Sequence, residues 1–247
     1  VLFRSFGSDV WMTRGEWLTA RMLAADVRDD FPMEALALQR GAGWDQDILD
    51  KQAAKGWSRF SRMLFPLPLG YRRIKDGDVL DFGPHQWRVV VGSGHSPEHA
   101  CLWNETEGVL ISGDQVLPRI SSNVSVNISE PAADPLGEWL SSIDKLLTIL
   151  PADLLVCPAH GEPFTGLHTR LIALRDEHHR RLDDVHAALG KTPLRAIDCF
   201  PLLFNRTIGD EHRELATGES IAHLNRLMAD GRAVREMRDE VYWYSAA

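Results

Sequence analysis

The stretch RVVVGSGHSPEHACLW, residues 88–103, decides the fold of this chain. Its apolar run Val89–Val91 predicts a buried strand, which stops at a glycine-rich turn that carries His95 and then His99. A lone loop histidine is more often a packed or hydrogen-bonded residue than a ligand. The meaning of the turn therefore depends on whether other strand ends present metal-binding side chains at the same place.

Two further apolar runs end in a side chain that can bind a metal ion. VLISGD, residues 109–114, ends at Asp114, and LLVCPAH, residues 154–160, ends at His160. Side chains just past a strand are held rigidly enough to meet a metal ion at about 2 Å. Two neutral imidazoles and one carboxylate suit Zn²⁺, with Mn²⁺ or Fe²⁺ as alternatives. The pattern therefore predicts that His95, Asp114 and His160 are metal ligands.

The composition is that of a globular protein with an acidic balance. The 247 residues are 44% hydrophobic and 25% charged, with a formal net charge of −8, which argues against a nucleic-acid or anionic-membrane partner. The three cysteines are far apart and form no disulfide framework, which favours a reducing, cytoplasmic location. No apolar run reaches the roughly 18–20 residues that cross a bilayer. The chain opens at Val1 instead of methionine, so we expect its true start to lie upstream.

The first part of the chain, residues 1–166, is expected to form a layered α/β domain. The helices at about 32–65 are expected as an insert whose aromatic residues pack in a core, with a lid over an apolar substrate as the alternative. Cys157 is expected to pack in the core. The expected strands are 9–13, 76–83, 86–92, 100–104, 107–114 and 153–161. The expected helices are 14–28, 32–43, 45–64 with an interruption at Gly56, and 134–150.

The remainder, residues 167–247, is expected to form a small winged-helix-like α+β domain. A long charged helix, 167–189, precedes two shorter helices at 193–204 and 219–232 and a hairpin with an acidic turn at 233–245. His178 and His179 lie in the charged run DEHHRRLDD, which predicts a solvated helix face.

Three motifs, GHSPEH, ISGDQVLP and CPAHGEP, occur in an order and spacing that resembles the later motifs of the metallo-β-lactamase superfamily. Within that superfamily, the three motifs are most similar to those of the glyoxalase II-like and lactonase-like hydrolases. The resemblance implies an αββα sandwich with a dinuclear metal site at the edge of its two sheets. It also implies that His95 binds the first metal, that His160 binds the second and that Asp114 bridges both, with two Zn²⁺ in a complete site. His99 is expected to support His95 from behind. The last part of the chain resembles the C-terminal module of one branch of that superfamily.

The family's defining motif, His-x-His-x-Asp-His, has no counterpart here. No histidine precedes His85, so three histidine ligands and an aspartate are missing, together with the first strands of the sandwich. We therefore expect an N-terminally truncated sandwich. Loss of the motif during evolution is the alternative, but it would leave apolar strands without partners.

The leading functional hypothesis is a metal-dependent hydrolase of an ester, thioester or lactone carbonyl that acts through metal-bound hydroxide on a small-molecule acyl substrate. This chain alone is expected to be an inactive fragment. A metal-dependent endoribonuclease is the second hypothesis, but residues 167–247 hold 12 Lys and Arg against 13 Asp and Glu, which is not a basic nucleic-acid face. This part is expected instead to pack on the core, to shape the pocket or to form a homodimer. A non-catalytic interaction module is the third hypothesis.

Overall fold

The structure is a computed structural model that describes residues 7–57, 61–62 and 67–247. The chain divides into two compact units, each built from three segments. Unit 1 comprises Val1–Val27, Ser58–Ser122 and Ser141–Ile172, and unit 2 comprises Arg28–Trp57, Asn123–Leu140 and Ala173–Ala247. The division into continuous domains 1–166 and 167–247 stays a prediction. The same holds for the insert at about 32–65 and for its role as a lid. Within the described residues, none of the helices combines the length and apolar character needed to cross a bilayer.

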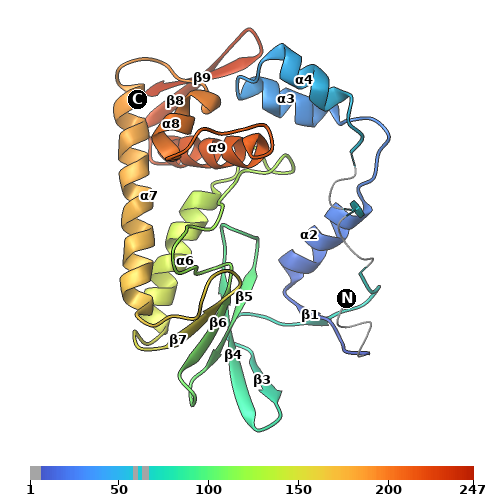
Figure 1. Cartoon of the computed structure of the whole chain (residues 1–247), viewed down its shortest axis with the longest axis vertical. Coiled ribbons are helices and arrows are strands. Elements are labelled where there is room, and N and C mark those ends of the chain that lie inside the picture. Colours follow the sequence, from blue (N-terminus) through green and yellow to red (C-terminus); the bar gives the residue numbers. More distant parts are fainter. Residues whose placement is uncertain (1–6, 58–60, 63–66) are drawn as a thin grey trace. The chain divides into compact units, whose positions relative to one another are not determined.

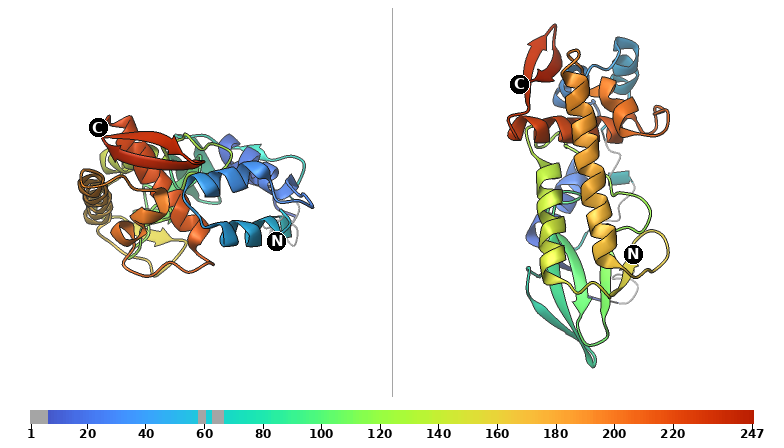
Figure 2. Two further views of the ribbon diagram at one scale, coloured as in Figure 1. Left: turned by 90° about the horizontal axis from the view of Figure 1, so that it is seen from above. Right: turned by 90° about the vertical axis from the view of Figure 1, so that its left-hand side faces the viewer.

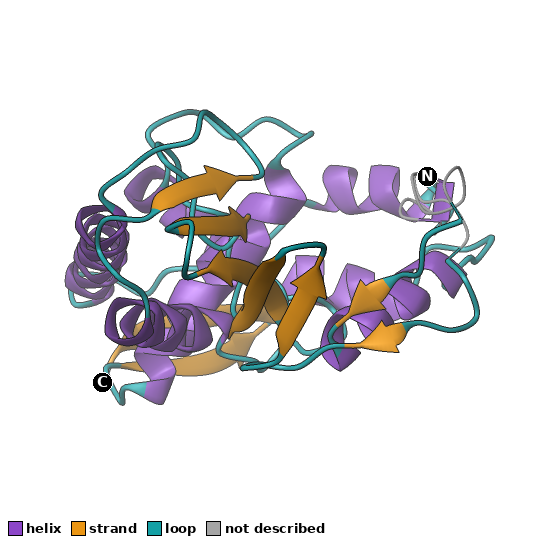
Figure 3. Cartoon of the chain, turned by 90° about the horizontal axis from the view of Figure 1, so that it is seen from below, coloured by secondary structure: helices purple, strands orange, loops and turns teal. Residues whose placement is uncertain are grey.

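Unit 1 is built on one five-stranded sheet, which Figures 1 and 3 show with its strands side by side. Neighbouring strands are antiparallel from β3 to β6, and β6 and β7 are parallel. A parallel pair needs a crossover connection, which α6 (Pro135–Ile149) provides. The strands, in sheet order, are β3 (Val79–Phe82), β4 (His85–Gly92), β5 (His99–Asn104), β6 (Val109–Gly113) and β7 (Leu155–Pro158).

The two faces of this sheet differ in burial. Val90 and Leu110 are on the face toward α6 and are at most 2% exposed. The opposite face, which we call the open face, carries a cross-strand row that runs from Leu102 through Ile111 to Cys157. Ile111 is 42% exposed, and Cys157 is only partly buried. The prediction that Cys157 packs in the core is therefore wrong, because its position in the strand places it on the open face.

A short parallel pair and a helix accompany the sheet in unit 1. β1 (Trp11–Met12) pairs with β2 (Arg72–Arg73), and α2 (Arg14–Ala25) follows β1 directly. The strand expected at 9–13 is thus only two residues long and half-buried instead of buried. Trp11 packs against a small cluster of Ile74, Leu80 and Val89, which covers the β4 end of the open face.

Unit 2 is mainly helical and ends in the hairpin of β8 and β9, which is red in Figure 2. This hairpin packs on α9, the last long helix. α4 ends at Ala53, before the expected end at residue 64, and residues 58–60 and 63–66 lie outside the described residues. The hairpin expected at 233–245 is present, and its turn is formed by Asp239 and Glu240, which both have positive φ. The elements are α3 (Met33–Gly41), α4 (Gln46–Ala53), α7 (Leu167–Leu189), η1 (Ala196–Cys199), α8 (Phe200–Leu203), α9 (Arg213–Ala229), β8 (Ala233–Arg238) and β9 (Val241–Ala246).

The prediction of a solvated position for His178 is wrong, whereas His179 beside it is exposed. His178 is 0% exposed and its ring lies 5.7 Å from that of His223, also 0% exposed. The physical reason is helical spacing, because His178 continues a buried stripe along α7 whose other members are Leu171, Leu174, Leu182, Val185 and Leu189. The charged residues around it hide this stripe in the sequence.

Candidate metal centre

His95 lies on a short loop between β4 and β5 that hydrogen bonds hold in place. The backbone N–H of Ser93 donates to Ser142 Oγ of α6 at 2.7 Å, and Ser93 Oγ donates to the Pro97 carbonyl at 2.9 Å. The first bond fastens the loop to α6, and the second closes it on itself. The His95 side chain is 28% exposed.

Asp114 follows directly after β6, and hydrogen bonds to backbone carbonyls stabilise the loop that it begins. The Gln115 N–H donates to the Ser112 carbonyl at 3.0 Å, and Ser122 Oγ donates to the Asp114 carbonyl. Farther along, the Arg170 guanidinium donates to the carbonyls of Leu117 and Ile120 at 2.6 and 2.8 Å. These bonds hold the carboxylate at the end of the sheet.

His160 is placed beside Asp114 by the parallel pairing of β6 and β7. The Ala159 N–H donates to the Gly113 carbonyl at 3.0 Å, which carries the pairing past the end of β7. Gly161 has a φ of +85°, and a Cβ there would lie 2.8 Å from Pro118 Cγ. Glycine is therefore needed for the turn that follows. The His160 side chain is 70% exposed.

The structure brings the three predicted residues together around one carboxylate. His95 Nε2 lies 3.8 Å from Asp114 Oδ2, and His160 Nε2 lies 3.4 Å from Asp114 Oδ1. Each histidine therefore faces a different oxygen. Oδ1 is buried and accepts no hydrogen bond from the residues that the structure describes. Among the described residues, no group of three or more His, Cys, Asp or Glu side chains is arranged to hold a metal ion. The arrangement is thus two His–Asp pairs that share Asp114.

His99 lies behind this group. Its Nε2 is 3.0 Å from the Ser112 carbonyl, and because a carbonyl only accepts, Nε2 carries the proton. Burial lowers the pKa of His99, although the hydrogen bond to Ser112 acts in the opposite direction. Its ring centroid lies 6.5 Å from that of His95. The neutral imidazole thus holds the end of β6 through the Ser112 carbonyl, and Nδ1 is the ring nitrogen that can accept a hydrogen bond.

Two neighbours of the three predicted ligands were not identified from the sequence. Glu98 is hydrogen bonded to the start of α2, where its Oε2 accepts from the Gly15 N–H at 2.6 Å. Gln115 is 0% exposed, and a Cβ at Gly92 would lie 2.4 Å from its Cδ. The glycines around the histidine motifs signalled close packing, but the partners lie more than 20 residues away and no local pattern points to them.

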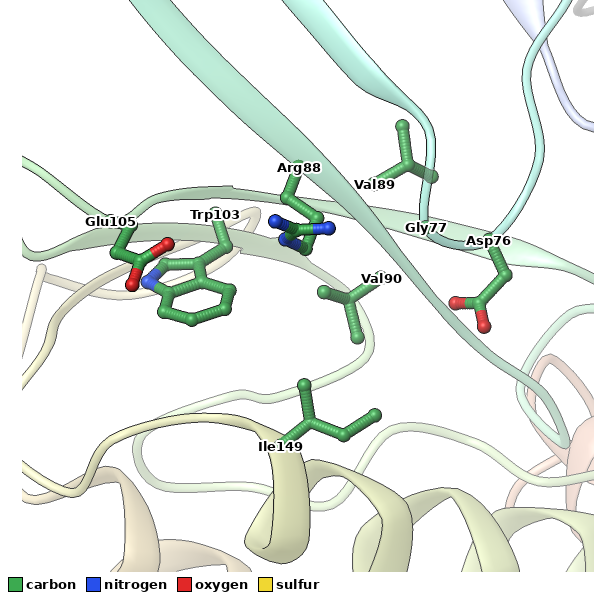
Figure 4. A pocket seen from close by; sticks show the side chains of 8 residues that line it. All are labelled: Asp76, Gly77, Arg88, Val89, Val90, Trp103, Glu105 and Ile149. Atoms are coloured by element: carbon green, nitrogen blue, oxygen red, sulfur yellow. The ribbon is translucent and has the colours of Figure 1, made fainter.

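A hollow of about 430 Å³ lies at the opposite end of β5 from His99. Figure 4 shows the side chains of Arg88, Trp103, Glu105 and Ile149 around it. Trp103 is 8% exposed, and its Nε1 has no hydrogen-bond partner among the described residues. The lining holds no histidine or cysteine, so the chemistry of this hollow differs from that of the group around Asp114.

Two family models match the chain. Residues 15–160 match the metallo-beta-lactamase superfamily, and residues 182–247 match the metallo-beta-lactamase-like, C-terminal domain. The first match includes His95 and Asp114 and ends at His160.

Two solved structures are similar to this chain over nearly all of its length. A beta-lactamase domain protein from Burkholderia ambifaria is 40% identical with a TM-score of 0.85, covering 97% of this chain and 66% of that chain. A metallo-beta-lactamase family protein from Thermus thermophilus is 25% identical with a TM-score of 0.76, covering 100% of this chain and 74% of that chain.

Two curated relatives have hydrolase names. "Probable metallo-hydrolase YqjP" from Bacillus subtilis is 28% identical over 162 residues, which are 64% of this chain and 50% of that protein. "Atrochrysone carboxyl ACP thioesterase" from Emericella nidulans is 29% identical over 171 residues, which are 68% of this chain and 52% of that protein. The chain therefore spans about half the length of the curated relatives it matches.

Proposed function

Because the chain belongs to the metallo-beta-lactamase superfamily, we propose that it carries part of the metal centre of a hydrolase that cleaves an acyl thioester, ester or lactone. The observation that carries the proposal is the position of Asp114 between His95 and His160, with a different oxygen toward each.

The donor set and its spacing fit metal binding. Two ligand atoms that are each about 2.1 Å from one tetrahedral ion lie roughly 3.4 Å apart. The His160–Asp114 and His95–Asp114 separations of 3.4 and 3.8 Å agree with that spacing. Asp114 Oδ1, buried and without a hydrogen bond from any residue in the described ranges, is an acceptor that a cation would satisfy. Zn²⁺ is the proposed ion, with Mn²⁺ or Fe²⁺ as alternatives.

The protein groups have separate roles in this proposal. His95 would hold one ion, His160 would hold the other, and Asp114 would bridge them. When bound, the metal supplies an acidified water molecule and a Lewis acid for the acyl oxygen. His99 holds the Ser112 carbonyl and so orients the Gly113–Asp114 backbone. Two protein contacts for each ion are fewer than the usual three, so we propose that ligands outside this chain complete the set.

The proposed substrate is a small acyl molecule, and a thioester comes first. A thioesterase is among the relatives of this chain, and the net charge of −8 suits a neutral acyl group better than a polyanion. The balance of acidic and basic residues in 167–247 gives no support to the endoribonuclease alternative.

The test compares zinc content and hydrolysis of acyl thioesters, esters and lactones in the longest native form of the protein. Asp114→Asn and His160→Asn should each lower zinc content, and should lower hydrolysis by more than about 100-fold, because even changes behind metal ligands cost roughly 10- to 100-fold. His85→Asn is the matched control, since His85 is a half-exposed histidine on β4. Full hydrolysis in Asp114→Asn, or cleavage of RNA with no acyl hydrolysis, would contradict the proposal.

The chain of 247 residues, tested alone, should bind zinc weakly. We expect it to retain less than about one zinc ion after dialysis and to hydrolyse acyl substrates almost undetectably, because each ion would have only two protein contacts. Two tightly held ions with turnover would show that the assigned ligand set is wrong.

A further inference from the structure

Glu98 joins the histidine loop to the start of α2. Its carboxylate Oε2 accepts from the Gly15 N–H at 2.6 Å, and its own N–H donates to Glu16 Oε1 at 3.0 Å. Thr13 Oγ1 donates to the Glu98 carbonyl at 2.7 Å. The backbone N–H, the backbone carbonyl and one carboxylate oxygen of Glu98 thus contact three residues that lie more than 80 positions earlier in the chain.

The contact has a clear physical basis. The first N–H groups of a helix have no partner inside the helix, and carboxylates are favoured at this positive end. Thr13 occupies the N-cap position of α2, but its side chain makes no capping bond and is used for Glu98 instead. Glu98 therefore supplies the cap from another part of the chain. Gly15 allows the close approach, because a Cβ there would lie 3.0 Å from Glu98 Cγ.

Glu98 lies three residues after His95 and directly before His99. The other end of the loop is already fastened to α6 through Ser93 and Ser142. The pairing of Gly92 with His99 joins the two strands at the base of the loop, and a tertiary contact on each side further limits the directions of the side chains that the loop carries. Ligands must be held to within about 0.5 Å of their working geometry. The α2 contact is therefore a second tertiary support of the loop that carries His95.

We infer that Glu98, held by Glu16, is a positioning residue that orients His95 toward Asp114. The inference rests on the proposed function, because this orientation has a purpose only if both side chains bind a metal ion. Removal of the carboxylate breaks the bond from the Gly15 N–H and leaves only the two backbone bonds of Glu98, to Thr13 and Glu16, so this end of the loop is held less firmly and His95 samples a wider range of directions.

The test is an NMR titration of the longest native form of the protein with Zn²⁺ that follows the ring signals of His95 and His160. Glu98→Ala should broaden or shift the metal-free His95 signal and weaken Zn²⁺ binding about 10-fold, which is typical of residues behind a ligand. Glu98→Gln keeps an acceptor for the Gly15 N–H and should restore most of the affinity. Glu105→Ala is the matched control, since Glu105 is an exposed glutamate that follows the same strand at its other end.

A separate variant covers the case in which Glu98→Ala fails to fold. Gly15→Ala favours the helix but pushes Glu98 away, so it should keep the melting temperature and still weaken Zn²⁺ binding. If Glu98 had only a structural role, the melting temperature and the Zn²⁺ affinity would fall together.

The outcomes separate the two ideas. Wild-type protein, in its longest native form, in which Zn²⁺ moves neither histidine signal would contradict the proposed function, and the metal-free His95 signal then decides on Glu98 alone. Metal-free signals and Zn²⁺ affinity that are unchanged in Glu98→Ala would overturn the positioning role.

Discussion

At the scale of single residues, the candidate metal centre depends on glycine as much as on its charged groups. Gly113, just before Asp114, has a φ of +54°, and a Cβ there would lie 2.3 Å from His99 Nε2. An L-residue is therefore strained in its backbone and overlaps the ring that donates to Ser112. Glycine at position 113 therefore lets the His99 ring approach the end of β6 and donate to the Ser112 carbonyl, two residues before Asp114.

Gly113→Ala should destabilise unit 1 more than Gly108→Ala does. Both glycines have positive φ, so each substitution costs roughly 1–2 kcal/mol in backbone strain. Only Gly113 also meets a side chain, since a Cβ at Gly108 has nothing within 4 Å. Urea denaturation of the two variants measures the difference. Equal losses would show that the His99 ring moves aside without cost.

At the scale of elements, the buried histidine pair of unit 2 is the feature with the clearest consequence. His178 and His223 come from α7 and α9, and burial is the main cause that lowers both pKa values, that of His223 to about 4. His223 Nδ1 pairs with the Glu219 carbonyl at 2.8 Å, so this nitrogen carries the proton of a neutral ring. The nearby Arg181 further disfavours a charged imidazole at both positions.

The stability of unit 2 should fall as the pH falls from about 6.5 to about 4. An unfolded histidine has a pKa of about 6.5, so the unfolded chain takes up the proton first, and stability present above pH 6.5 is lost toward the folded pKa. For His223 alone the loss is about 3 kcal/mol. The free energy of unfolding, measured in urea at several pH values, checks this.

His223→Leu should flatten this pH dependence. The control is His179→Leu, which removes an exposed histidine of α7 and should leave the slope unchanged. A wild-type stability that does not change between pH 7 and pH 4.5 would show that the pair is charged, or hydrated, in the folded protein.

At the scale of the whole molecule, the open face of the unit 1 sheet limits how the chain behaves in solution. Ile111 and Leu155, on adjacent strands, are each 42% exposed. Neighbouring apolar side chains on an open sheet favour association between molecules.

Ile111→Thr combined with Leu155→Thr should reduce aggregation and lower stability only slightly, because both side chains are already half-exposed. Light scattering during heating measures the first effect, and urea denaturation measures the second. Ile120→Thr, which changes a 61% exposed isoleucine outside the sheet, is the matched control. Aggregation that is the same in all three proteins would show that the open face takes no part in it.

Local patterns in the sequence were sufficient to predict the strands of the five-stranded sheet and the strand ends that carry the ligand candidates. Residues 88–103 predicted β4, the loop and β5. The runs that end at Asp114 and His160 predicted β6 and β7 and the points at which these strands end. These predictions succeeded because a strand has a period of two and stops at glycine or proline, so that both features are visible within a few residues. The motif order also identified the superfamily, which the family models confirm.

Only the tertiary structure decided which distant groups meet. The two histidines face separate oxygens of Asp114 because β4 and β7 lie on either side of β5 and β6 in one sheet. The bond from Gly15 to Glu98 joins residues 83 positions apart, and the burial of His178 depends on the helices packed against α7. Such contacts follow from strand order and helix packing, which local periodicity does not encode, because the same local pattern is compatible with many arrangements of its neighbours.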